Sequence, residues 1–129
     1  MIKLWYIILY VPDVLDAIDF YETIFWLERK FINPEGDYGE VSTWETTLAF
    51  AKNTLWKENI WEYQEIKLSE KPVGIELAFT TDDVEALYQK ILENNGVTIM
   101  PPKQKPWWQT VAYARDPNGF LLEICTPIN

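Results

Sequence analysis

The sequence predicts an α+β fold made of two βαβββ modules in tandem, and the prediction rests on a repeated order of elements. Residues 4–11 and residues 74–80 each read as a β-strand, and each is followed at once by apolar residues at helical spacing. Three short strand-like segments then follow each helix. The second set of elements begins about 70 residues after the first, which indicates an internal repeat.

The first module is predicted from strand propensity and from helix-capping residues. Residues 4–11 are rich in β-branched and aromatic side chains, which favour a strand. Asp13 with Asp16 three residues later is similar to a capping box, so we expect a helix over residues 13–25. The remaining strands of this module are expected at residues 28–32, 38–43 and 46–51.

The second module shows the same signals more clearly. Asp82 and Glu85 form a capping box, and Asn95 with Gly96 provides a helix stop. Asp116 opens the sequence Asp-Pro-Asn-Gly, which predicts a tight turn before the last strand. The strands after the helix are expected at residues 98–100, 110–115 and 120–125.

We expect a single domain over residues 1–129. Module one covers about residues 1–52, module two covers about residues 73–129, and residues 53–72 form a linker loop in which a short helix could form around residues 55–61. A chain of 129 residues with 48% hydrophobic side chains can bury one core, and an aromatic share of 16% exceeds what that core needs. Some aromatic rings should therefore be exposed, in a pocket or at an interface.

The charge and the rare residue types exclude several classes of function. A net charge of −9 argues against nucleic acid and anionic membranes as partners and suits a cationic or neutral ligand, although acidity can also serve solubility alone. The chain has no histidine, so a Ser-His-Asp triad is excluded. Cys125 is the only cysteine and is expected to be an inert buried thiol. No leader or membrane-spanning run is evident, so we expect a soluble, cytoplasmic protein.

Several motifs resemble those of the vicinal oxygen chelate superfamily, which includes glyoxalases, extradiol dioxygenases, fosfomycin-resistance enzymes and bleomycin-resistance proteins. The motifs are Tyr10-Val11-Pro12-Asp13, Phe20-Tyr21, Asp116-Pro117-Asn118-Gly119 and Leu122-Glu123. The resemblance covers about residues 3–127. It implies that each module forms a half-open sheet and that the two modules form a half-barrel cleft of the glyoxalase/bleomycin-resistance type.

The resemblance also implies where a metal would be held. The four ligand positions of the superfamily fall on Tyr6, Ala49, Glu76 and Glu123, where imidazoles and carboxylates are usual. Independently, period-two alternation places Glu76 and Glu123 on the side of their strands away from the apolar residues. Two carboxylates and a phenol suit a transition metal poorly. A weak Mg or Mn site at the two glutamates remains open, as does pairing of one or both with water, a backbone donor or Arg115. In a third alternative the two carboxylates repel each other and attract a cation, and one of them holds a proton near neutral pH and could act as a general base.

Aromatic side chains complete the predicted ligand-binding site. Its residues are Tyr6, Trp44, Glu76, Trp108, Tyr113 and Glu123. Relatives often carry glycine at the positions of Trp5, Trp26, Trp44 and Trp108 in this chain. Glycine tolerates a left-handed backbone conformation and tryptophan does not, so the sequence leaves open whether the local turns keep that conformation. It also leaves open whether the rings fill the pocket. Trp5 is expected to face the helix, opposite Tyr6, and any of these rings could instead belong to the core or to a dimer interface.

These observations favour a metal-free small-molecule-binding protein, similar to the bleomycin-resistance branch, that sequesters an aromatic or cationic ligand. No catalytic residue is assigned. Two alternatives stay open: a lyase or isomerase of glyoxalase type that uses a divalent ion on Glu76 and Glu123, and a non-catalytic scaffold whose cleft is filled by tryptophan. The resemblance further implies a homodimer.

Overall fold

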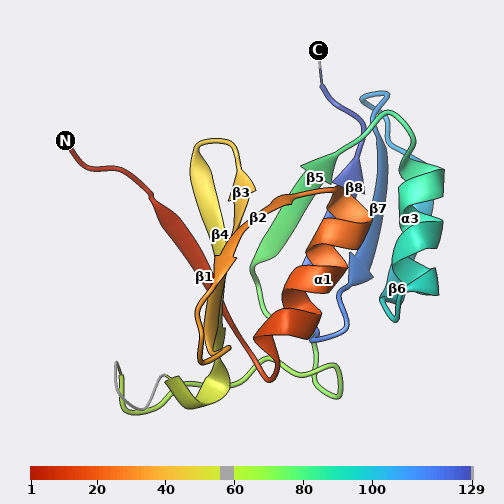
Figure 1. The fold of residues 1–129 in the computed structure, drawn as a ribbon. Helices are drawn as coiled ribbons and strands as arrows, with labels where there is room; N and C mark the ends of the chain where they lie inside the picture. Colours follow the sequence, from red (N-terminus) through yellow and green to blue (C-terminus); the bar gives the residue numbers. More distant parts are fainter. Residues whose placement is uncertain (56–59, 129) are drawn as a thin grey trace. The chain divides into compact units, whose positions relative to one another are not determined.

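The computed structural model describes residues 1–55 and 60–128, and the chain divides into two compact units, residues 1–65 and residues 66–129. Each unit contains a four-stranded sheet with one α-helix packed against it (Figure 1). The α+β architecture with a repeated βαβββ order is therefore confirmed. The two units are described separately below.

Unit 1 contains one mixed sheet. Its elements are β1 (Tyr6–Val11), α1 (Val14–Phe25), β2 (Glu28–Ile32), β3 (Tyr38–Thr43), β4 (Thr46–Lys52) and the 3-10 turn η1 (Asn53–Leu55). The strand order is β1-β4-β3-β2, with β1 parallel to β4 and the other pairs antiparallel. Asp13 caps α1 as predicted, because its Oδ1 accepts a hydrogen bond of 3.0 Å from the backbone N–H of Asp16.

The core of unit 1 lies between α1 and one face of the sheet. Ile18 and Tyr21 of α1 are fully buried, as is Phe50 of β4, and the rings of Tyr21 and Phe50 are 5.2 Å apart. Helix and sheet approach closely at Gly39, where a Cβ atom would lie 2.6 Å from Ile18 Cδ1. A larger residue at this position would force the Ile18 side chain to move and would crowd the Phe31 carbonyl oxygen, which lies 3.0 Å from the same Cβ position.

Unit 2 repeats this topology. Its elements are β5 (Glu76–Thr80), α3 (Val84–Glu93), β6 (Val97–Gln104), β7 (Thr110–Arg115) and β8 (Leu121–Cys125). The strand order is β5-β8-β7-β6, with β5 parallel to β8 and the other pairs antiparallel. Ile91 of α3 is fully buried, as are Leu122 and Ile124 of β8, so the core lies on the side of the sheet that α3 covers.

Two local predictions differ from the structure. The N-cap of α3 is Asp83, whose Oδ1 accepts a hydrogen bond from the backbone N–H of Ala86, and not Asp82. Both carboxylates sit at the helix start, and only the backbone decides which one can reach the free N–H groups. Strand β6 is longer than predicted because it continues through Pro101 and Pro102, where its register with β7 shifts. The expected short helix around residues 55–61 falls mostly on residues 56–59, which lie outside the described part of the chain.

The loop that enters unit 2 is held by one buried arginine. The Arg115 guanidinium, 7% exposed, donates hydrogen bonds to the backbone carbonyls of Lys67, Leu68 and Glu70, and to that of Gly119. One fixed planar cation thus satisfies carbonyls that lie more than 40 residues away in sequence.

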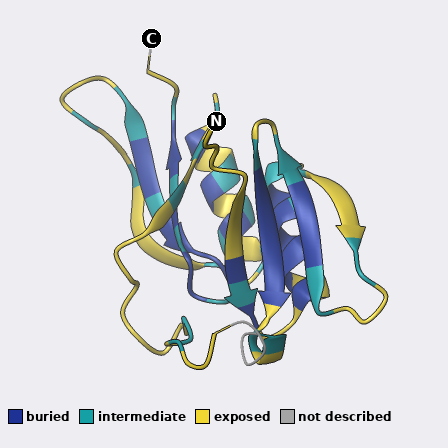
Figure 2. Ribbon diagram, turned by 90° about the vertical axis from the view of Figure 1, so that its left-hand side faces the viewer, coloured by how far each residue is buried: buried dark blue, intermediate teal, exposed yellow. Residues whose placement is uncertain are grey.

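Burial follows the position of each strand in its sheet. The inner strands β3, β4, β7 and β8 are largely buried, whereas the outer strands β2 and β6 are mostly exposed (Figure 2). Strand β1 is exposed at its start and buried toward its end. Polar side chains on the inner strands are therefore held in a fixed geometry and are the best candidates for a ligand-binding site.

Candidate functional site

The candidate site of unit 2 lies on the sheet face that α3 does not cover. In the strand register, Glu123 of β8 is opposite Tyr113 of β7 on one side and Ala78 of β5 on the other. Directly paired residues share a face, so Glu76, two residues before Ala78, also lies on this face. The prediction that Glu76 and Glu123 point to the same side is therefore confirmed, and Tyr113 joins them.

Tyr113 and Glu123 form the best-defined polar pair of this face. The Tyr113 hydroxyl donates a hydrogen bond of 2.8 Å to Glu123 Oε1. This hydrogen bond raises the pKa of Tyr113 to about 12, and burial and the negative charges of Glu123 and Glu76 add to the effect. The phenol therefore stays protonated at neutral pH and acts as a fixed donor to the carboxylate.

Glu76 is exposed and lies close enough to Glu123 to interact with it. Partial desolvation of its carboxyl raises the pKa of Glu76 although the residue as a whole is exposed, and both the charge of Glu123 and a hydrogen bond with it act in the same direction. Two neighbouring carboxyls that repel each other are stabilised by a cation placed between them. Arg115 does not supply that cation, contrary to one of the sequence-based alternatives, because its guanidinium binds backbone carbonyls.

Cys125 is two residues after Glu123 on β8 and therefore lies on the same face of the sheet. Its thiol is free and buried, and its Sγ lies 3.8 Å from the carbonyl oxygen of Phe79. Burial raises the pKa of Cys125 to about 11, with Glu123 and Glu76 contributing. The group is therefore a neutral thiol at physiological pH, as the sequence predicts.

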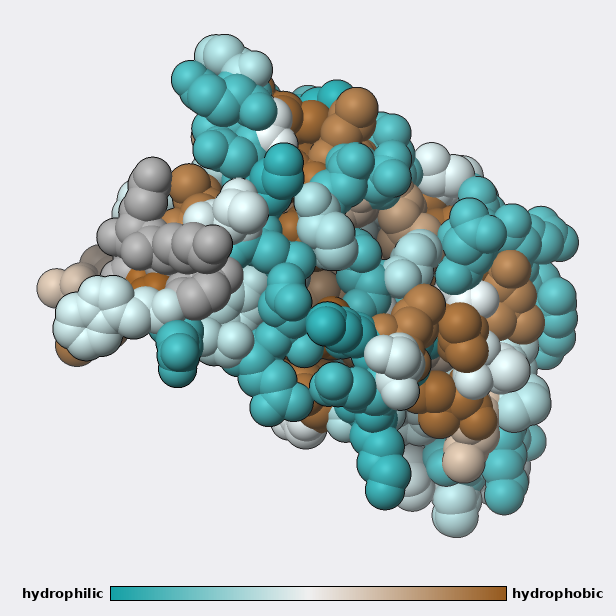
Figure 3. Space-filling view, turned by 90° about the horizontal axis from the view of Figure 1, so that it is seen from below, coloured by the Kyte–Doolittle hydropathy of each residue, from teal (hydrophilic) through white to brown (hydrophobic). Residues whose placement is uncertain are grey.

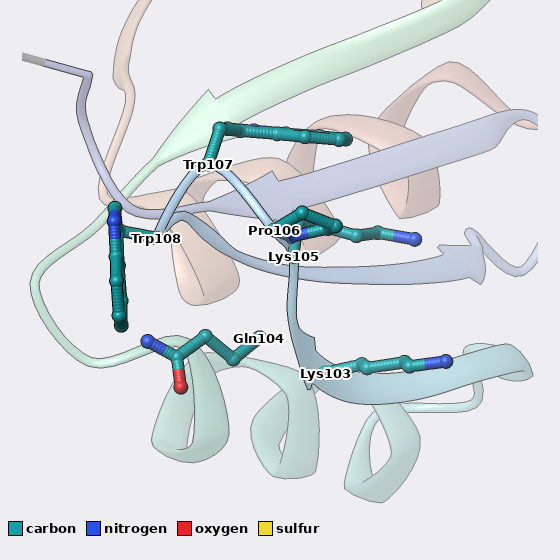
Figure 4. A pocket seen from close by; sticks show the side chains of 6 residues that line it. All are labelled: Lys103, Gln104, Lys105, Pro106, Trp107 and Trp108. Carbon is teal, nitrogen blue, oxygen red and sulfur yellow. The ribbon is translucent and has the colours of Figure 1, made fainter.

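A second feature of unit 2 is the hairpin that joins β6 to β7. Residues 103–108 line an open hollow of about 520 Å³ (Figure 4). The turn closes through a hydrogen bond of 2.9 Å from the Trp108 N–H to the Lys105 carbonyl, with Pro106 at the position that proline favours. Figure 4 shows Lys103, Lys105 and Trp107 extending to one side of the hairpin, whereas Gln104 and Trp108 extend to the other. Trp108, a predicted site residue, thus points away from the lysines.

Unit 1 carries a buried carboxylate that sequence reasoning missed. Glu40 is 8% exposed and accepts a hydrogen bond of 2.7 Å from the Tyr38 hydroxyl through its Oε2. Burial raises the pKa of Tyr38 above its usual range, and the hydrogen bond to Glu40 adds to this. Glu40 is directly opposite Ala49, the superfamily ligand position that lacks a carboxylate here. Alternation along residues 38–43 could have identified it, since Tyr38 and Glu40 occupy every second position.

The remaining predicted residues of unit 1 lie at the start of the sheet. Tyr6 is the first residue of β1 and is 43% exposed. Trp44 lines a hollow of about 580 Å³ together with Trp5, Lys3 and Lys30, and the Lys30 ammonium donates a hydrogen bond of 2.9 Å to Thr47 Oγ1. Trp5 was expected to face the helix. It is instead 59% exposed and its ring stacks beside that of Tyr6, because it precedes β1 and the strand alternation does not extend to it.

Three tryptophans adopt the backbone conformation that glycine favours. Trp26, Trp44 and Trp108 have φ angles of 55°, 81° and 72°, so the turns stay left-handed without glycine. Trp26 ends α1, Trp44 is the first central residue of the two-residue β3–β4 hairpin, and Trp108 closes the β6–β7 hairpin. Their side chains are 83%, 99% and 82% exposed, so the rings do not belong to the core of either unit.

The side chains of the site differ from those that hold a metal in the superfamily that the sequence resembles. The chain has no histidine, and the described residues contain no group of three or more cysteine, aspartate or glutamate side chains placed to hold an ion. Glu123 Oε1 is already bound by the Tyr113 hydroxyl. The residues present therefore do not fit a zinc, iron or nickel centre.

The repeated units and their polar sheet faces define a protein of the glyoxalase/bleomycin-resistance fold. The model of the glyoxalase-like domain family matches residues 4–129, and the chain belongs to this family.

Known proteins are similar to this chain over nearly its whole length. The uncharacterized protein YraH of Bacillus subtilis (strain 168) is 28% identical over 124 residues, which cover 95% of this chain and 96% of YraH. A glyoxalase-related enzyme from Fulvimarina pelagi has a TM-score of 0.83 at 20% identity. The superposition covers 100% of this chain and 94% of that enzyme. A glyoxalase/bleomycin resistance protein/dioxygenase family enzyme from Burkholderia phytofirmans PsJN has a TM-score of 0.82 at 17% identity, with 98% and 100% of the two chains covered. These structural similarities establish the fold.

No helix in residues 1–55 and 60–128 combines the length and the apolar character needed to cross a bilayer. Hydrophilic side chains cover much of the face shown in Figure 3, with apolar groups gathered over part of it.

Proposed function

We propose that this chain is a small-molecule-binding protein that captures an aromatic or cationic ligand without a resident metal. The observation that carries the proposal is the cluster of Glu76, Tyr113 and Glu123 on the face of the unit 2 sheet that α3 does not cover. Tyr113 fixes one carboxylate by a 2.8 Å hydrogen bond, and the second carboxylate lies beside the first. A cation placed here would be attracted by both charges and would remove their mutual repulsion.

Aromatic groups around the sheets support the same proposal. Trp107 and Trp108 flank a hollow in unit 2, and Trp5 and Trp44 flank another in unit 1. Lysines also line both hollows, so the indole faces there suit the aromatic part of a ligand, on whose planar rings they can stack. The high exposure of Trp44 and Trp108 favours ligand binding over the scaffold alternative, in which tryptophan fills the binding space.

Titration of tryptophan fluorescence tests the proposal directly. The probes are bleomycin, a cationic glycopeptide, and berberine, a planar cation, with benzyl alcohol as the neutral control. We expect a cationic probe to quench the tryptophan fluorescence. The quenching should be unchanged when the protein has first been treated with EDTA to remove metal ions. Replacement Glu123→Gln should weaken binding about five-fold, as expected for loss of one partly exposed charge pair. Replacement Glu93→Gln, at the exposed end of α3, is the matched control and should leave binding unchanged.

Metal analysis separates the proposal from the enzymatic alternative. Elemental mass spectrometry of the native protein should find no stoichiometric transition metal. A tightly bound nickel, zinc or iron ion that is lost in the double variant Glu76→Gln, Glu123→Gln would overturn the proposal and favour a metal-dependent lyase or isomerase.

A homodimer is a further part of the proposal. The start of β1 and the residues before it expose apolar side chains along a sheet edge, and such edges are usually covered. These side chains are Leu4, Trp5, Tyr6, Ile7 and Ile8, which are 37% to 70% exposed. Sedimentation velocity should give twice the mass of the chain, and the replacement Ile8→Lys should shift it toward the monomer.

A further inference from the structure

The face of the unit 2 sheet that α3 does not cover carries charges of both signs. Lys103 of β6 is directly opposite Val111 of β7, and Val111 lies two residues before Tyr113 on the same strand. Directly paired residues share a face, as do residues two apart on one strand. Lys103 therefore lies on the face that carries Glu76 and Glu123, at its hairpin end.

The cationic end of this face is formed by more than one lysine. Lys105 and Trp107 extend to the same side of the hairpin as Lys103 (Figure 4). In the described part of the chain, neither Lys103 nor Lys105 forms an ion pair, whereas both arginines are used by the fold. The chain has a net charge of −9 and only 11 basic residues. Two unpaired lysines beside a tryptophan thus form a local site for an anion on an otherwise acidic protein.

The strand geometry sets the distance between the two ends. Strands β6 and β8 lie on either side of β7, and neighbouring strands are about 4.8 Å apart. Lys103 and Glu123 are also offset by two residues along β7, which adds about 7 Å in the other direction. The two charged positions are therefore about 12 Å apart at the backbone. A free amino acid has its charges too close together to reach both ends.

We propose that this face binds an amphoteric aromatic molecule of about tripeptide length. Its ammonium group meets Glu123 and Glu76, its carboxylate meets Lys103 and Lys105, and its ring lies against Trp107. The inference rests on the proposed function and adds to it the class of ligand, its polarity and its direction on the sheet. A tripeptide with free ends is the simplest such molecule, because three extended residues span about 10 Å.

The test uses glycyl-phenylalanyl-glycine in four forms, with free ends, with the amine acetylated, with the carboxyl amidated, and with both ends blocked. Binding to the full chain is measured by isothermal titration calorimetry at low salt and pH 7. We expect the free form to bind most tightly and each block to raise Kd about five-fold, as for loss of one partly exposed charge pair.

Protein variants assign each end of the peptide to its partner. With Lys103→Gln and Lys105→Gln combined, the free and amidated peptides should bind equally. With Glu76→Gln and Glu123→Gln combined, the free and acetylated peptides should bind equally. Lys103→Arg and Lys105→Arg combined should keep the discrimination against the amide. Lys71→Gln, an exposed lysine of the same unit, is the control and should behave as the wild type.

The outcomes separate this inference from the proposed function. Equal binding of the free and amidated forms to the wild type would overturn the inference and leave cation capture intact. An effect of amidation without an effect of acetylation would overturn both. Failure of all four forms to bind would overturn the inference, while the titration with cationic probes tests the broader function independently.

Discussion

The Tyr113 hydroxyl donates a 2.8 Å hydrogen bond to Glu123 Oε1 across the β7–β8 pair. The two residues are ten positions apart in sequence and directly opposite each other in the sheet. The turn of residues 116–119 sets this register, because Asp116 Oδ1 accepts hydrogen bonds from the backbone N–H groups of Asn118 and Phe120. A local turn motif thus fixes the geometry of the candidate site.

Tyr113→Phe should make the stability of the protein less sensitive to alkaline pH. The folded pKa of Tyr113 is about 12 and the ordinary value is 10.0, so the unfolded chain releases the phenolic proton first. The stabilising contribution of Tyr113 is therefore complete below pH 10.0 and is lost as the pH rises to about 12. We expect the variant to be about 1 kcal/mol less stable than the wild type at pH 7. This gap should narrow above pH 10.0 in urea unfolding experiments, and a constant gap would contradict the assignment. Tyr6→Phe serves as the control.

Glu76→Gln should stabilise the protein at neutral pH. The folded pKa of Glu76 is raised from 4.5, so the protonated form is favoured in the folded state. Stability associated with Glu76 is therefore present below pH 4.5 and is lost as the pH rises through the folded pKa. The gain in the variant should be less than about 1 kcal/mol, because the side chain is exposed and screened. Thermal melts at pH 7 and pH 4 check this, and an equal gain at both values would contradict repulsion by Glu123.

Trp44→Gly should raise the free energy of unfolding by about 1 kcal/mol, because a side chain at positive φ is strained and the ring is almost fully exposed. Trp108→Gly should act in the same direction. Trp44→Ala keeps the Cβ atom and should give no gain. Trp61→Gly removes a ring that is 90% exposed at a residue without positive φ, and it should not stabilise. Chemical denaturation of the four variants distinguishes relief of strain from loss of an exposed ring.

Arg115→Met should cost about 2 to 4 kcal/mol, because it leaves several backbone carbonyls of a packed loop without a charged donor. Residues 67–70 should then become sensitive to proteolysis before the rest of unit 2. Arg115→Lys should restore part of the stability, since an ammonium group can satisfy only some of the carbonyls that the guanidinium binds. Limited proteolysis with peptide mapping checks the order of cleavage.

Much of the fold could be predicted because its signals are local. The Asp13 cap, the helix through Phe25 and the strands at Glu28–Ile32, Tyr38–Thr43 and Thr110–Arg115 all follow from short-range propensity and periodicity. The shared face of Glu76 and Glu123 also follows from alternation with period two. The N-cap of α3 was misplaced by one residue, since adjacent aspartates have the same chemistry and differ only in backbone angle.

The sequence by itself determined the repeated βαβββ architecture, the absence of imidazole and the side of each strand on which polar groups lie. Only the tertiary structure showed that Tyr113 binds Glu123, that Arg115 is occupied by the loop, and that Glu40 is buried beside Tyr38. These contacts depend on strand register and on segments distant in the chain. Alternation along one strand gives the direction of a side chain, but its partner is set by how neighbouring strands align.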